Sequence, residues 1–148
     1  MSTTRHHQTS ISIDTPGRSL VEVTHKIASI VDSSRVSTGL VTVFCRHTSA
    51  SLLIQENADP SAARDLLDWF ERLAPDGDPR YAHFAEGPDD MPAHLRSAVT
   101  RTSETMPITD GRLNVGTWQG LYLFEHRTAP QTRTLVVHCT GECAEQLP

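Results

Sequence analysis

The chain has 148 residues and a formal net charge of -5, which is the size of one ordinary domain and excludes a strongly basic surface for nucleic acid or anionic membranes. Its three cysteines are an odd number, which does not indicate a secreted disulfide framework. No apolar run approaches the roughly 20 residues of a membrane span. We therefore expect a single cytoplasmic domain over residues 1–148 that binds a small molecule or a protein, not nucleic acid or a membrane.

The first third of the chain contains three predicted strands and a helix. Residues 10–14 alternate apolar and polar side chains, as a half-buried strand does, and residues 19–23 form a second strand after the turn Pro16-Gly17. We predict that these two strands pair as an opening hairpin. After a short helix from Thr24, residues 39–45 are β-branched and nearly all apolar, which predicts a central strand buried on both faces.

The next segment combines a strand with a strong helix start. A polar corner, His47-Thr48-Ser49, precedes a predicted return strand at residues 50–55, and Asp59-Pro60 follows. An aspartate N-cap can accept a hydrogen bond from a free backbone N–H, and proline at the first helical position loses no needed donor. We therefore predict a helix that begins at Pro60 and ends before the breaker cluster at residues 75–79.

The second half is predicted to be mostly strand. Residues 81–92 have no period of 2 or 3.6 and should form a polar loop, followed by a short helix at residues 92–98. Further strands are predicted at residues 104–108, 112–115, 119–127 and 132–139, the first of them at a sheet edge because of Pro107. This order predicts an α+β fold, a mostly antiparallel two-sheet β-sandwich with flanking helices.

Histidine and carboxylate side chains in the polar loop make it a candidate site. Between His83 and His94 lie Glu86, Asp89 and Asp90, so imidazoles and carboxylates could converge on one metal ion or one substrate. Two histidines with ten residues between them are not a diagnostic zinc spacing, and the alternative is that they anchor loops and helix ends.

Several separated motifs together resemble the YjbQ-like family of small cytoplasmic proteins, often described as secondary thiamine-phosphate synthases. The matching segments are His47-Thr48-Ser49-Ala50-Ser51, Glu56-Asn57-Ala58-Asp59-Pro60, Tyr81 with His83, residues 86–94, Gly111-Arg112-Leu113 and Gly116-Thr117-Trp118-Gln119-Gly120. The resemblance extends from about Ile11 to Glu142. It implies a compact YjbQ-like α+β fold containing a β-sandwich, and assembly as a homotrimer.

The resemblance also implies one shared site. Its implied metal ligands are His47, His83 and His94, and its implied catalytic neighbours are Glu56, Asn57, Asp59, Asp90 and Gln119. Neutral imidazoles with a carboxylate suit a borderline divalent ion, with zinc as the candidate. Asp59 has two conflicting expected roles, since an N-cap faces its own helix and a site residue faces the pocket. Some family members carry acidic residues directly after the His83 position, where this chain has Phe84 and Ala85.

The implied reaction joins an aminopyrimidine pyrophosphate to a thiazole phosphate with loss of pyrophosphate, so the expected substrate is a phosphorylated small molecule. Such a reaction needs positive charge on the leaving group. Arg46, Arg96 and Arg112 are available, but the sequence has no glycine-rich phosphate loop. We expect a small metal-binding enzyme with thiamine-phosphate synthesis as a side activity. One alternative is a non-enzymatic trimeric module that binds a small ligand or a metal, and another is that the polar cluster only satisfies a trimer interface.

Overall fold

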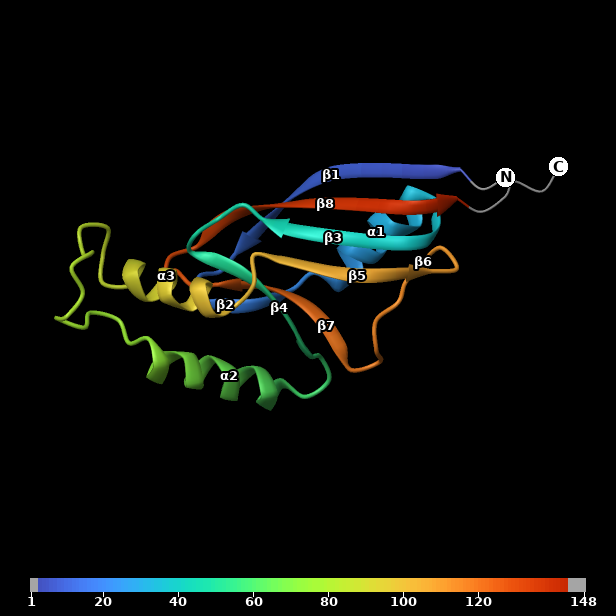
Figure 1. Cartoon of the computed structure of the whole chain (residues 1–148). Coiled ribbons are helices and arrows are strands. Elements are labelled where there is room, and N and C mark those ends of the chain that lie inside the picture. Colours follow the sequence, from blue (N-terminus) through green and yellow to red (C-terminus); the bar gives the residue numbers. More distant parts are fainter. Residues whose placement is uncertain (1–2, 144–148) are drawn as a thin grey trace.

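The computed structural model describes residues 3–143 as two antiparallel sheets with three helices (Figure 1). The larger sheet has the strand order β1-β8-β3-β5-β6 and the smaller one has the order β2-β7-β4. The strands are β1 (Thr4–Thr15), β2 (Ser19–Glu22), β3 (Val36–Cys45), β4 (Ala50–Glu56), β5 (Ser103–Thr109), β6 (Arg112–Leu113), β7 (Gln119–Glu125) and β8 (Gln131–Cys143). The helices are α1 (Thr24–Ser34), α2 (Pro60–Leu73) and α3 (Asp90–Val99). The predicted α+β two-sheet fold is confirmed.

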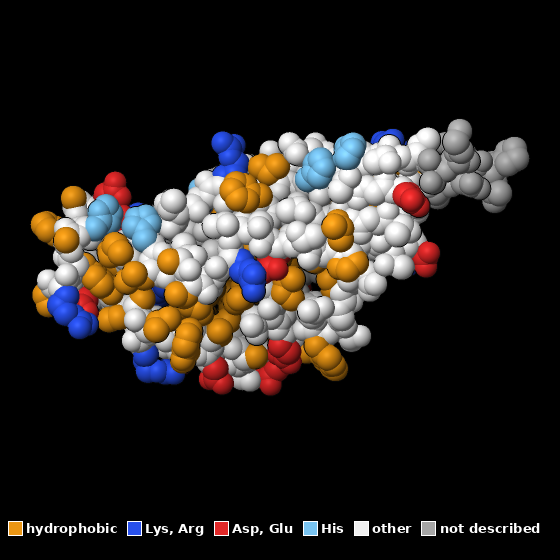
Figure 2. Space-filling view, in the orientation of Figure 1, with side chains coloured by type: hydrophobic (Ala, Val, Ile, Leu, Met, Phe, Trp, Pro, Cys, Tyr) orange, Lys and Arg blue, Asp and Glu red, His pale blue; other side chains and the backbone are white. Residues whose placement is uncertain are grey.

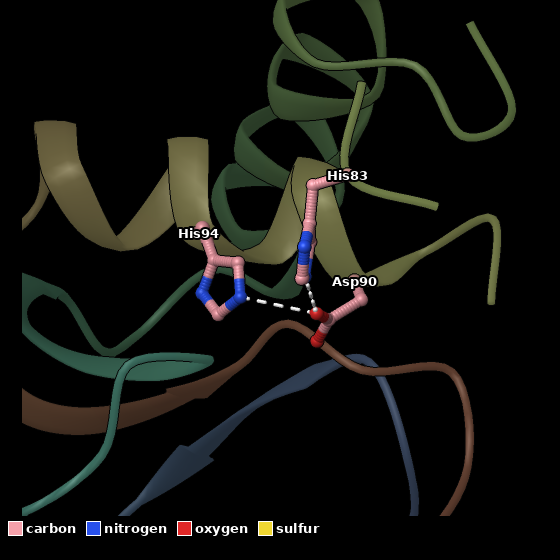
Figure 3. A group of neighbouring side chains, drawn as sticks. All are labelled: His83, Asp90 and His94. Atoms are coloured by element: carbon pink, nitrogen blue, oxygen red, sulfur yellow. Dashed lines mark hydrogen bonds and ion pairs between the residues drawn. The ribbon is translucent and has the colours of Figure 1, made fainter. Parts of the chain in front are cut away.

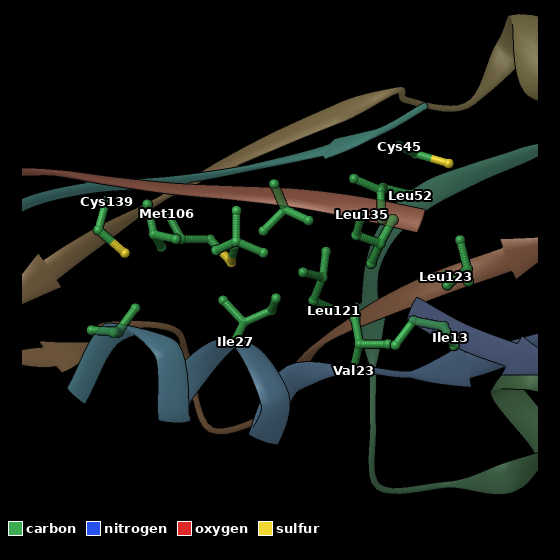
Figure 4. Packing of buried hydrophobic residues seen from close by; sticks show 14 of the residues in the cluster. Ile13, Val23, Ile27, Cys45, Leu52, Met106, Leu121, Leu123, Leu135 and Cys139 are labelled. Carbon is green, nitrogen blue, oxygen red and sulfur yellow. The ribbon is translucent and has the colours of Figure 1, made fainter. Parts of the chain in front are cut away.

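The hydrophobic core lies between the larger sheet on one side and the smaller sheet with α1 on the other (Figure 4). Ile27 of α1, Leu121 of β7 and Leu135 of β8 are almost wholly buried there. Full burial of one such side chain contributes about 1.5–3 kcal/mol. The core therefore fixes the inner face of the larger sheet against both of the other layers.

The outer face of the larger sheet is open in the described part of the chain. In β3, Val41 and Val43 point into the core, whereas Leu40 and Phe44 on the other face are 48% and 47% exposed. The prediction that residues 39–45 are buried on both faces is therefore wrong. Although its apolar run is continuous, β3 is buried on one face only, because the described elements cover only the inner face of the sheet.

Strand pairing differs from the predicted order in three places. The opening hairpin is wrong, because β1 pairs with β8 along its whole length and β2 pairs with β7. Gly17, with φ of +103°, makes the reversal that carries the chain from one sheet to the other. Likewise, β4 pairs with β7 and not with β3, and β5 lies one strand inside the edge formed by β6. Side-chain alternation reports which face is buried, but it does not name the partner strand.

The helices α2 and α3 lie at one end of the sandwich (Figure 1). As predicted, Asp59 caps α2 by accepting a hydrogen bond from Ser61 N–H at 2.9 Å, and Pro60 is the first helical residue. Phe70, the only buried residue of α2, packs edge-on against Phe124 with ring centroids 5.0 Å apart. Apolar side chains gather between α2 and α3 on the surface (Figure 2). Within residues 3–143, no helix has the length and apolarity needed to cross a membrane.

Candidate metal centre

Three side chains converge at the start of α3: His83, Asp90 and His94 (Figure 3). Each can offer one ligand atom, and these atoms all lie within 4.8 Å of one another. Asp90 Oδ2 is 2.6 Å from His83 Nε2 and 3.1 Å from His94 Nε2. Asp90 and His94 share one face of α3 because they are four residues apart. Asp90 is buried while both histidines are partly exposed, so solvent reaches the group from the side of the histidines.

A tied loop brings His83 to this helix. Gly77, with φ of +69°, donates its N–H to the carbonyl of Pro88 at 3.0 Å, which joins the two ends of the loop. The Tyr81 hydroxyl donates to the carbonyl of Pro75 at 3.2 Å. These two hydrogen bonds close the loop that presents His83 to α3.

Arg127, just after β7, holds the carboxylates that begin α3. Its Nη1 donates to Asp90 Oδ1 at 2.7 Å and its Nε donates to Asp89 Oδ2 at 3.0 Å. Burial opposes ionisation of Asp89, but hydrogen bonds from Thr128 N–H and from Arg127 outweigh it and lower the pKa of Asp89 to about 2. The pKa of Asp90 is also lowered, because the hydrogen bond with His83 and the nearby cations outweigh burial. Asp90 thus presents an ionised oxygen to the two imidazoles.

The tautomer of His94 follows from its backbone partner. His94 Nδ1 lies 3.0 Å from the carbonyl oxygen of Thr48, which can only accept, so Nδ1 carries the hydrogen. In the neutral imidazole the lone pair is then on Nε2, and it faces Asp90 Oδ2. Two acceptors cannot attract each other across 3.1 Å unless a proton or another cation lies between them. Metal-binding histidines are commonly anchored through the second ring nitrogen in this way.

His47 lies outside this group. Its Nε2 accepts a hydrogen bond from Thr134 N–H at 2.8 Å, and its pKa is lowered, mainly by burial and also by the positive charge of Arg133. The next residue, Thr48, reaches the site through its carbonyl only. The structure therefore does not bring the three predicted histidines together, and Asp90 takes the third position.

The other predicted neighbours lie at the far end of β4. Thr48 precedes this strand and Glu56 ends it, so the two ends are about 20 Å apart at ~3.3 Å per residue. At that far end Glu56 Oε2 accepts from Asp59 N–H, Asn57 Nδ2 donates to the carbonyl of Gln119, and Gln119 Oε1 accepts from Gly116 N–H. Glu56, Asn57, Asp59 and Gln119 thus form a second polar cluster, which ties the start of α2 to the loop before β7.

A buried ion pair that the sequence did not reveal supports the corner beside the site. Arg133 of β8 donates through Nε and Nη2 to Glu125 of β7, at 2.7 and 2.5 Å, and Nη2 also donates to Ser49 Oγ at 3.0 Å. Thr15 Oγ1 donates to the same carboxylate at 2.8 Å. Both charged residues lie in strands, and the alternation of apolar and polar residues did not predict that either would be buried. The pair fixes the corner whose Thr48 carbonyl orients His94.

A second buried group is His126, at the end of β7. Its Nε2 is 2.7 Å from Ser51 Oγ, and within residues 3–143 its buried Nδ1 has no hydrogen-bond partner. Burial, with the positive charges of Arg96, Arg18 and Arg133, lowers the pKa of His126 to about 3. Protonation of this ring therefore disfavours the folded state.

We expect the free energy of unfolding to fall by about 2 kcal/mol or more between pH 7 and pH 5. The pKa of His126 is depressed in the folded chain, so the unfolded chain binds the extra proton as pH falls through about 6.5. The lowered pKa of His47 acts in the same direction, whereas the stabilisation from Asp89 is lost only below pH 3.8. Urea unfolding at both pH values measures the change. A His126→Gln variant should lose less stability over this interval, and an equal loss would exclude His126 as its main source.

Comparison with known proteins assigns the chain to a family. The sequence model of the family described as UPF0047 protein YjbQ-like matches residues 9–142. A UPF0047 protein of Synechocystis is 55% identical over 140 residues, covering 95% of each chain, and the UPF0047 protein YjbQ of Escherichia coli O157:H7 is 38% identical over 137 residues, covering 92% of this chain and 99% of the other. The chain belongs to the YjbQ-like UPF0047 family.

Solved structures agree with this assignment. A conserved hypothetical protein from Thermus thermophilus is 35% identical, with a TM-score of 0.78 over 87% of this chain and 97% of the other. A YbjQ-like protein from Sulfolobus solfataricus is 23% identical, with a TM-score of 0.88 over 95% of this chain and 100% of the other, which shows a shared fold. The predicted YjbQ-like family and fold are confirmed.

Proposed function

We propose that the chain is a small metal-binding enzyme that holds a divalent ion of the zinc type between His83 Nε2, Asp90 Oδ2 and His94 Nε2. The observation that carries this proposal is the convergence of the three ligand atoms within 4.8 Å of one another, with His94 Nδ1 anchored on Thr48 and Nε2 turned toward the Asp90 carboxylate. A divalent ion at that place would be coordinated by both His94 Nε2 and Asp90 Oδ2. The donor set, two imidazole nitrogens and one carboxylate oxygen, fits zinc and similar ions.

The open side of the group favours catalysis over a purely structural role. Catalytic zinc sites have three protein ligands and keep one position for water or substrate, whereas structural sites use four. When bound, such an ion supplies Lewis acidity and lowers the pKa of its water. Here Asp90 would carry the counter-charge, Arg127 would hold that carboxylate in place, and the exposed edge of His83 would face the substrate.

The proposed substrate is a phosphorylated small molecule, with thiamine-phosphate formation as a side activity. An oxyanion is a natural ligand for the open position of a metal. Of the three arginines expected to help, Arg96 is buried and donates to the carbonyl of Ala74, while Arg46 and Arg112 are not buried. Arg127 is the guanidinium that contacts the metal-binding group itself.

The test is thiamine-phosphate formation from the aminopyrimidine pyrophosphate and the thiazole phosphate, measured together with bound metal. We expect both to be lost in His83→Ala and His94→Ala, and in the native chain after treatment with a chelator, with recovery on adding zinc. His25→Ala, an exposed histidine of α1, is the matched control. Unchanged metal content and turnover in both variants would overturn the proposal, whereas metal-dependent binding without turnover would establish the non-enzymatic module instead.

We also propose that the chain is cytoplasmic and assembles as a homotrimer, as the family resemblance implies. Support comes from exposed apolar side chains on the two helices at this end of the molecule, with Trp69 and Leu73 of α2 about half exposed and Val99 of α3 62% exposed. Native mass measurement of the chain and of its His83→Ala and His94→Ala variants tests this. A trimer lost on these substitutions, with metal content unchanged, would instead assign the polar cluster to the subunit interface.

A further inference from the structure

We infer that the chain has a second metal site, formed by His6 of β1 and His138 of β8 on the outer face of the larger sheet. In the antiparallel pair, Gln8 lies opposite His138 and His6 lies opposite Thr140, so the two histidines are diagonal neighbours on one face. Their ring centroids are 5.7 Å apart. Figure 2 shows adjoining histidine atoms over these strands on the open surface.

The Nδ1 atom of each histidine is held by a hydrogen bond, which leaves Nε2 available. His138 Nδ1 is 2.9 Å from Gln8 Oε1, an amide oxygen that only accepts, so Nδ1 carries the hydrogen and Nε2 has the lone pair in the neutral ring. His6 Nδ1 is 2.9 Å from the hydroxyl of Thr140, which can donate or accept. His6 can therefore adopt the same tautomer, and the anchoring repeats the contact between His94 and Thr48.

The ring separation suits joint coordination. With a zinc–nitrogen bond of about 2.0–2.1 Å and a ring centroid about 1.1 Å further out, two imidazoles on one tetrahedral ion have centroids about 5.2 Å apart. The observed separation is 5.7 Å for His6 and His138, and 5.4 Å for His83 and His94 at the first site. The centroid separation of the His6–His138 pair is therefore compatible with two imidazoles on one ion.

The residues around this pair define which ions it would bind. The neighbours Gln8, Thr140 and Thr42 on the same face are uncharged, and the exposed carboxylate of Glu142 lies diagonal to His6 on the side away from His138. The pair itself therefore offers two nitrogen ligands. Such a site selects ions that favour imidazole, with Cu²⁺ bound more tightly than Ni²⁺ or Zn²⁺, and does not suit Mg²⁺ or Ca²⁺. It has fewer ligands than the His83 group and should bind more weakly. This inference is independent of the proposed function.

Copper titration of the intact chain separates the two sites. In a background that combines His83→Ala with His94→Ala, which removes both imidazoles of the first site, we expect one Cu²⁺ per chain with an electron paramagnetic resonance signal from nitrogen ligands. Adding His6→Ala or His138→Ala should raise the dissociation constant for Cu²⁺ by about 100-fold. The matched control is His25→Ala in the same background, which should leave it unchanged. Unfolding curves in urea confirm that the variants remain folded.

Two results would overturn the second site. One is a chain with His83→Ala and His94→Ala that binds no Cu²⁺, and the other is Cu²⁺ binding of equal affinity in the presence and absence of His138. Loss of Cu²⁺ in the His25→Ala control would likewise exclude His6 and His138 as the ligands that decide binding. Failure of the first site would not produce these results, because its removal is the starting point of the titration.

Discussion

An Asp90→Asn chain is expected to bind zinc or cobalt at the first site at least about 100-fold more weakly than the native chain. The carboxylate provides the only negative charge among the three ligands, and the amide that replaces it cannot neutralise the ion. Asparagine has the same size, and its side-chain oxygen can still accept a hydrogen bond from Arg127. The loss should therefore appear in metal affinity and not in the fold. Competition with a coloured chelator measures the affinity.

Asp78→Asn is the matched control for this experiment. Asp78 lies in the same loop region and its carboxylate is bound by Arg80, at 2.6 Å from Nη2. Within residues 3–143 this carboxylate is hydrogen-bonded to Arg80 and not to His83 or His94. We expect this variant to bind zinc like the native chain. Equal affinities for all three chains would show that Asp90 is not a ligand, and equal losses in both variants would show that general negative charge is responsible.

A Glu125→Leu chain is expected to lose about 3–5 kcal/mol of folding free energy, the largest effect on stability that we predict. Glu125 is fully buried and Arg133 is 6% exposed, so the substitution leaves a buried guanidinium without its counter-charge. Removing both charges avoids that cost, and Glu125→Leu combined with Arg133→Met should recover most of the loss. Urea unfolding of the native chain, both single variants and the double variant completes the cycle.

The same cycle can be followed through metal affinity. Arg133 also holds Ser49, and the adjacent Thr48 carbonyl orients His94. The double variant should therefore regain stability without regaining full metal affinity, because the corner is no longer fixed. A double variant as unstable as Glu125→Leu would contradict the assigned role of the ion pair. A double variant with native metal affinity would show that the ion pair does not influence metal binding through Ser49 and Thr48.

Local signals in the sequence predicted local structure well. The helix α2 begins at Pro60 with Asp59 as its cap, because both the cap and the proline act within one turn. Strand partners were harder to predict, since β1 and β8 pair across most of the chain and no short segment records that choice. The apolar run of β3 similarly suggested two buried faces, although Leu40 and Phe44 face outward.

The part of the candidate site that is local in sequence was predicted, and the part that is not local was missed. His83, Asp90 and His94 lie within twelve residues, so one loop and one helical turn can bring them together. The segment from His47 to Asp59 is also short in sequence, but β4 lies within it, and the extended strand separates the residues before it from those after it by about 20 Å. Arg127 was missed because it gives no periodic signal. A sequence argument would have needed to ask which cation balances the adjacent carboxylates of Asp89 and Asp90.

The position of β8 in the larger sheet has a consequence for how the chain folds during synthesis. It lies between β1 and β3, although it is the last strand in chain order within residues 3–143. Until it leaves the ribosome, β1 has no partner in that sheet and β3 has only β5, so the nascent chain exposes strand edges and apolar faces. Contacts this distant in sequence also slow folding. The larger sheet should therefore form only once β8 has left the ribosome, and a nascent chain stopped before β8 should remain open to proteases and chaperones.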